Sequence, residues 1–160
     1  MQSLLDELIA RANHALDIHD VAALRACIEV ADTLLPSLNA LLASRLQADR
    51  YRWRGVRCAV IGDQPSALAA FTEALAAYTA IGDGAGITRS MVNIVKSYSN
   101  VGDTAQALRW YHQALDRCTE DADDVTKALL HLNIGNVHSM CGEIDVKGKG
   151  LMTTYWLEPS

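Results

Sequence analysis

The sequence predicts an all-α protein, a solenoid of about seven helices arranged as helical hairpins, with a short C-terminal tail that is β-hairpin-like or disordered. Alanine and leucine supply 44 of the 160 residues, and both side chains lose little conformational freedom in a helix. A segment centred on Gly-Asp recurs forty residues along the chain, which is typical of a repeat protein. All 24 alanines lie at or before Ala128, so the tail differs in composition from the rest.

The two clearest copies of the repeat begin with Ile61-Gly62-Asp63 and Val101-Gly102-Asp103. Glycine suits the C-terminus of one helix and aspartate the N-cap of the next. Pro65 fits just inside the following helix, where its missing N–H costs nothing. Each copy continues with alanine, an aromatic residue and alanine, spaced four and then three apart on one helical stripe. These stripe residues are Ala67, Phe71 and Ala74, then Ala107, Tyr111 and Ala114.

Two less regular copies flank this pair. The earlier one covers residues 4–35, with Ala23 and Cys27 at the stripe positions and a helix break near His19-Asp20. Pro36 is then expected to start the next helix. The later copy begins at residues 132–135, and Gly142 follows one period after Gly102. The expected stripe residues do not follow Gly142, so the repeat domain is assigned to residues 1–142.

The charge balance argues against nucleic acid as a partner. Fourteen Lys and Arg are outnumbered by 19 Asp and Glu, which gives a formal charge of −5, whereas phosphate-binding surfaces are basic. No membrane span is expected either, because the longest uncharged stretch, residues 128–142, has 15 residues and a spanning helix needs about 20.

A cytoplasmic location is predicted from the N-terminus and the cysteines. Asp6 and Glu7 appear at once, unlike the basic start of a secretory signal. The four cysteines are scattered without a Cys-x-x-Cys pair, and reduced thiols acting as small apolar fillers are favoured over disulfides. They are Cys27, Cys58, Cys118 and Cys141.

Residues 1–142 resemble the tetratricopeptide repeat family, in a variant with a period of about forty residues. The resemblance implies a right-handed stack of antiparallel helix pairs, whose first helices line a concave groove that binds a peptide or partner protein. Asn side chains can bond a peptide backbone, and Arg or Lys can meet a carboxylate. The alternative is an ordinary solvated helix face. The matching groove positions are Arg52, Arg89, Asn93, Lys96, Asn133 and Asn136.

Evidence for a metal or cofactor site is thin. His131, His138 and Cys141 share one predicted helix, but no second pair of ligands accompanies them, and packing or surface roles are favoured. The sequence contains no nucleophile elbow and no glycine-rich phosphate loop. We therefore expect no metal and no cofactor in this chain.

The tail, residues 143–160, has a different character. Gly148 and Gly150 are poor helix formers, while Thr153, Thr154 and Tyr155 favour strands. Residues 146–157 resemble the C-terminal end of class III adenylate and guanylate cyclases, in which a Val-Lys-Gly-Lys-Gly-x-Met-x-Thr-Tyr-x-Leu run forms the last strands. The resemblance implies that Lys147 contacts the nucleotide triphosphate, with Lys149 a weaker candidate.

Three functions remain open at this point. The leading one is a peptide-binding or protein-binding scaffold or sensor module of a signalling protein. The alternative is a fragment of a nucleotidyl cyclase, but the aspartates that hold Mg²⁺ or Mn²⁺ in an intact parent enzyme have no counterpart here, so the chain alone should be inactive. The third is self-association through the truncated last repeat, which leaves Ile134, Val137 and Met140 without their usual cover.

Overall fold

The computed structural model describes residues 2–117, 131–132, 135, 143–146 and 150–153. The first of these ranges is helical, which confirms the predicted helical fold class for that part. It contains six α-helices, whereas about seven were predicted; the segment expected to form the seventh falls mainly on residues outside the described ones. The elements are α1 Gln2–Asp17, α2 Val21–Leu34, the 3₁₀ turn η1 Leu35–Ser37, α3 Ala40–Val60, α4 Gln64–Ala80, α5 Gly84–Val101 and α6 Thr104–Arg117.

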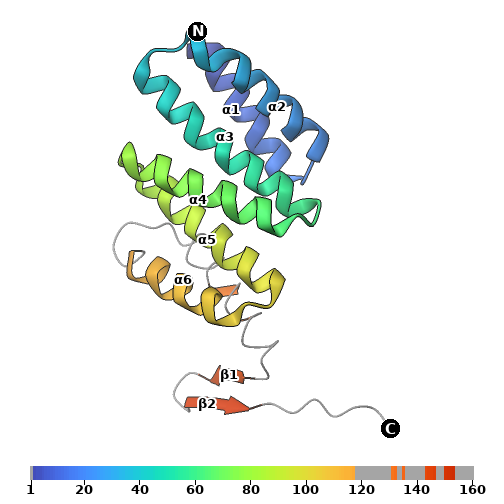
Figure 1. Cartoon of the computed structure of the whole chain (residues 1–160), viewed down its shortest axis with the longest axis vertical. Coiled ribbons are helices and arrows are strands. Elements are labelled where there is room, and N and C mark those ends of the chain that lie inside the picture. The colour runs from blue at the N-terminus through green and yellow to red at the C-terminus, as the bar shows by residue number, and fades with distance from the viewer. Residues whose placement is uncertain (1, 118–130, 133–134, 136–142, 147–149, 154–160) are drawn as a thin grey trace.

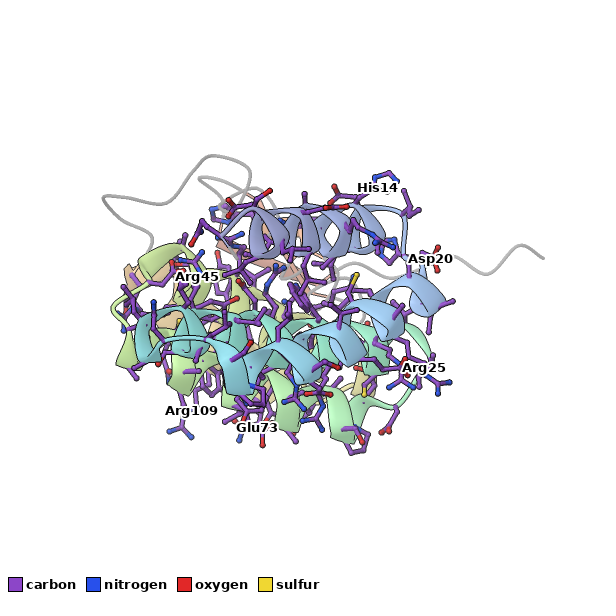
Figure 2. The ribbon with its side chains drawn as sticks, turned by 90° about the horizontal axis from the view of Figure 1, so that it is seen from above. His14, Asp20, Arg25, Arg45, Glu73 and Arg109 are labelled. Atoms are coloured by element: carbon purple, nitrogen blue, oxygen red, sulfur yellow. The ribbon has the colours of Figure 1, made fainter. Side chains whose placement is uncertain are left out.

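The helices stack in chain order along the long axis of the molecule, as Figure 1 shows. Each helix packs against the helices before and after it, and α3 also contacts both α1 and α5. Within the described residues, no comparable contact joins α2 to α4 or α4 to α6. Figure 2 places Glu73 of α4 and Arg109 of α6 on the side of the molecule opposite His14 of α1. The odd-numbered helices thus converge on one face, which we call the odd-helix face.

Four of the turns between helices share one structure. A residue one or two positions beyond the end of the first helix has a positive φ, and the next residue is an aspartate. The aspartate N–H donates to the carbonyl five residues earlier, and its carboxylate accepts from the N–H three residues later, which caps the next helix. The residues with positive φ are His19 at 55°, Gly62 at 85°, Gly82 at 71° and Gly102 at 77°.

These turns confirm the helix ends predicted at Gly62 and Gly102, the caps at Asp63 and Asp103, and the break at His19-Asp20. Pro65 lies in the first turn of α4, as predicted. The turn at Gly82-Asp83 has the same form, although the forty-residue repeat did not single it out.

The prediction that Pro36 starts a helix is wrong. Pro36 lies in η1, which prolongs the end of α2, and α3 begins at Ala40. Asn39 caps α3, because its side-chain oxygen accepts from the N–H of Leu42 at 3.0 Å. Proline has no side-chain acceptor for the free N–H groups of a helix start, and asparagine does.

Helix α4 packs its two large aromatic residues against glycines of its two neighbours. A Cβ atom added to Gly55 of α3 would lie 2.4 Å from the Phe71 ring, and one added to Gly86 of α5 would lie 2.2 Å from the Tyr78 ring. Both rings are buried. The stripe alanines Ala67, Ala74, Ala107 and Ala114 are also buried, as predicted, whereas Tyr111 is half-buried.

Beyond the helices, β1 Glu143–Val146 pairs antiparallel with β2 Gly150–Thr153. Glu143 lies opposite Thr153 and Val146 opposite Gly150. Neither strand packs against a helix in the part of the chain that the structure describes. None of the described helices combines the length and apolarity needed to cross a membrane.

Candidate functional site

The odd-helix face carries two adjoining hollows. The first has a volume of about 290 Å³ and lies between the end of α1, the middle of α3 and α5. The second has about 310 Å³ and extends toward the C-terminal ends of α3 and α5. Both are lined by His19, Val56, Asn93 and Lys96, so they form one continuous depression.

Four of the six predicted groove residues line this depression. Arg52 and Arg89 line the first hollow, and Asn93 and Lys96 line both. Arg89, Asn93 and Lys96 are spaced four and three apart, which puts them on one face of α5. Asn133 and Asn136 lie outside the described residues.

Arg52 is the most buried of these four side chains. It is 9% exposed, and one of its terminal nitrogens donates to Oδ1 of Asn13 at 3.1 Å, which joins α3 to α1. Its Nε atom is buried without a hydrogen-bond partner among the described residues. Arg89 and Lys96 are exposed, and Nε of Arg89 donates to the carbonyl of Ala85 at 3.2 Å.

A buried polar cluster adjoins Arg52 and joins α3 to α4. The hydroxyl of Tyr78 donates to Oδ1 of Asp49 at 2.5 Å, and Asp49 is 5% exposed. Nε of Arg45 lies 3.5 Å from Oδ2 of Asp49, and its Nη1 lies 3.1 Å from Oδ2 of Asp83. Arg45 thus links the cluster to the residue that caps α5.

The environment of Tyr78 keeps its hydroxyl protonated. Burial raises the pKa of Tyr78 well above its usual value, and the negative charge and hydrogen bond of Asp49 raise it further, while the nearby Arg52 opposes both. The pairing of Asp49 with Tyr78 was not predicted from the sequence. The one local signal is an aspartate in a helix interior, four residues after Arg45 and three before Arg52.

The first hollow is positively charged although the chain as a whole is acidic. Arg52, Arg89 and Lys96 line it together with a single carboxylate, that of Asp17. The neighbouring Arg50 is paired with Asp32. Arg52 instead donates to the uncharged amide of Asn13, and among the described residues it forms no ion pair with a carboxylate.

The other candidate chemistry gains no support from the described residues. No group of three or more His, Cys, Asp or Glu side chains there is arranged to hold a metal ion. His131 instead lies with Nδ1 3.1 Å from the hydroxyl of Tyr111, while His138, Cys141, Lys147 and Lys149 fall outside the described residues. Burial raises the pKa of Cys27 and of Cys58, which keeps both free thiols protonated and weakly nucleophilic.

Comparison of the chain with protein-family models, with curated proteins and with solved structures produced no match.

Proposed function

We propose that this chain is a tetratricopeptide-type binding module that holds a segment of a peptide or partner protein in the depression on its odd-helix face. The observation that carries the proposal is the gathering of Arg52, Arg89, Asn93 and Lys96 around that depression. These four residues are also groove positions that the resemblance to the repeat family implies.

The chemistry of the depression indicates which segments fit it best. An acidic side chain or a terminal carboxylate suits the hollow where Arg52, Arg89 and Lys96 meet. The amide of Asn93 can both donate to and accept from a peptide backbone. Val56 and Phe71 line the second hollow, which therefore suits an aliphatic side chain next to the acidic one.

The proposal has two further parts, which are a right-handed solenoid arrangement of the helices and a role in signalling. Successive helix pairs in a right-handed solenoid account for contacts confined mainly to neighbours in the chain. In such an arrangement the module acts as the scaffold or sensor part of a cytoplasmic signalling protein.

The test uses short peptides that carry glutamate beside leucine, labelled for fluorescence anisotropy, and matched peptides with glutamine in place of glutamate. We expect the acidic peptides to bind more tightly. The double variant Arg89→Ala/Asn93→Ala should weaken that binding by about tenfold or more, because charge-assisted bonds are lost. A matched control is Arg109→Ala/Gln113→Ala, which removes an exposed Arg and an exposed amide at the same spacing on α6. Equal binding by both variants places the binding surface elsewhere.

The cyclase alternative stays a prediction that rests on residues 146–157. Its test is an assay of the purified chain for conversion of ATP or GTP into a cyclic nucleotide with Mg²⁺ or Mn²⁺. We expect no turnover. Turnover that is lost in Lys147→Ala would establish the alternative.

A further inference from the structure

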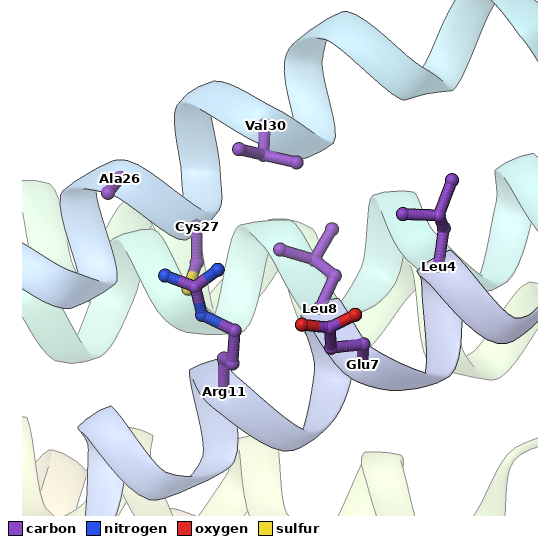
Figure 3. Close-up of a pocket in the computed structure, with 7 residues that line it drawn as sticks. All are labelled: Leu4, Glu7, Leu8, Arg11, Ala26, Cys27 and Val30. Atoms are coloured by element: carbon purple, nitrogen blue, oxygen red, sulfur yellow. The ribbon is translucent and has the colours of Figure 1, made fainter.

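A third hollow lies at the opposite edge of the first helix pair, away from the odd-helix depression. It has a volume of about 130 Å³ and opens between α1 and α2. Leu4 and Leu8 of α1 and Cys27 and Val30 of α2 form its apolar lining, as Figure 3 shows. Leu4 is 58% exposed and Val30 is 47% exposed. Side chains of this size form an apolar strip on the outer surface of the stack, as binding faces commonly do.

Two opposite charges on α1 border the strip along one edge and do not pair with each other. Glu7 and Arg11 are one turn apart on α1, at a spacing that normally allows an ion pair, yet no ion pair of either residue occurs within the described part of the chain. In Figure 3 the Arg11 guanidinium lies over Cys27. Arg25 and Glu29 of α2 have the same spacing and do pair, at 2.9 Å. The charges of Glu7 and Arg11 are therefore available to a partner.

A surface with an unpaired acid and an unpaired base one turn apart on one helix, beside an apolar strip, is complementary to itself across a two-fold axis that passes between the two charges. We infer that a second copy of this chain docks on the α1–α2 face about a two-fold axis through the hollow. The axis places Glu7 of each copy against Arg11 of the other, and Leu4 and Val30 of both copies cover the strip between them. Such an interface is closed, because each copy uses the same patch.

The size of the face sets the strength of this dimer. A 16-residue helix is about 24 Å long, and two helices side by side are about 20 Å wide, so each copy buries about 500 Å². Stable complexes bury about 800 Å² per partner. The dimer is therefore weak. An experiment that detects it must cover protein concentrations from about 10 μM to about 1 mM.

The experiment measures the mass of the full chain by sedimentation velocity over that concentration range. We expect a monomer–dimer equilibrium. Glu7→Arg alone and Arg11→Glu alone should each raise the dissociation constant at least about tenfold, since like charges then face each other across the axis. An equimolar mixture of these two variants should form heterodimers with about the affinity of the unchanged chain, because every facing pair is again of opposite sign.

The matched control is Asp6→Arg, which makes the same charge change on α1 one residue away and outside the lining of the hollow. Its dissociation constant should stay within about twofold of the unchanged chain. The heterodimer result also guards against misfolding, because unfolded variants would not complement each other. A monomer at every concentration overturns the inference. So does a dimer that Glu7→Arg leaves intact, which would assign self-association to another surface such as the last repeat.

Discussion

The hydroxyl of Tyr78 donates a 2.5 Å hydrogen bond to the carboxylate of Asp49, and this bond joins α4 to α3 in the interior. Asp49 lies three residues before Arg52 on α3 and also contacts Arg45. Replacement of Tyr78 by Phe keeps the ring but leaves the buried carboxylate with one partner fewer. Tyr78→Phe should lower the free energy of unfolding by about 1–3 kcal/mol, measured by urea denaturation. The control is Tyr111→Phe, which removes the hydroxyl of a half-buried tyrosine and should lower the free energy of unfolding by less than about 1 kcal/mol. Equal losses in the two variants would mean that the bond to Asp49 adds no stability beyond that of an ordinary tyrosine hydroxyl.

The same tyrosine gives the fold a pH dependence in alkaline solution. Its pKa is raised in the folded chain above the ordinary value of 10.0, so the protonated form is stabilised by folding. The contribution of Tyr78 is complete below the pH at which it titrates in the unfolded chain and is lost as the pH rises above that value. Unfolding free energies measured in steps above pH 10 should therefore fall more steeply for the unchanged chain than for Tyr78→Phe. Parallel curves would contradict this.

The contact between Gly86 and Tyr78 predicts that alanine substitutions at two glycines of α5 differ in their effect on stability. Gly86→Ala places a Cβ atom 2.2 Å from the Tyr78 ring and should destabilise the chain by about 1–3 kcal/mol. Gly84→Ala, in the first turn of α5, meets no atom within 4 Å and should be neutral or stabilise by up to about 1 kcal/mol. Thermal unfolding of both variants checks the difference in sign. A similar loss in both would show that the contact with the ring is not the cause.

His19 is the one described non-glycine residue with a positive φ, at 55°. Side chains other than glycine carry a steric cost of about 1–2 kcal/mol in this conformation, part of which is offset because glycine is more flexible when unfolded. His19→Gly should therefore raise the unfolding free energy by about 0.5–1 kcal/mol. His14→Gly, within helix α1, should lower it by about 0.5–1 kcal/mol. Destabilisation by His19→Gly would mean that the contacts of the His19 side chain stabilise the turn by more than the steric cost of its positive φ.

The turns could be predicted from sequence because their chemistry is local. A glycine that ends a helix and an aspartate that caps the next one are adjacent in the chain, so Gly62-Asp63 and Gly102-Asp103 carry their own signal. Gly82-Asp83 has the same signal, but it lies midway between Gly62-Asp63 and Gly102-Asp103. The forty-residue repeat therefore predicted the other two turns and not this one. The prediction for Pro36 was wrong because the local signal of proline is ambiguous. Proline fits a 3₁₀ turn at the end of one helix as well as the start of another.

The candidate site was predictable in part. The resemblance to the repeat family implied Arg52, Arg89, Asn93 and Lys96 as groove positions, and all four line the depression. The bond between Asp49 and Tyr78 joins residues 29 positions apart, and no local pattern specifies which buried aspartate meets which tyrosine. The missing ion pair between Glu7 and Arg11 was equally hidden, because their spacing alone predicts that they pair.

The position of α4 has a consequence for how the molecule opens. Phe71 faces α3 and Tyr78 faces α5, so separating α4 from either neighbour exposes an aromatic ring to water and leaves a void against a glycine. In a stack with contacts mainly between neighbours, opening spreads inward from the ends. Backbone amides of α4 should then exchange their hydrogens last. The two helices that supply most of the depression, α3 and α5, are thus attached to the slowest-opening part of the chain, so the part of the depression between them persists while the outer helices fluctuate.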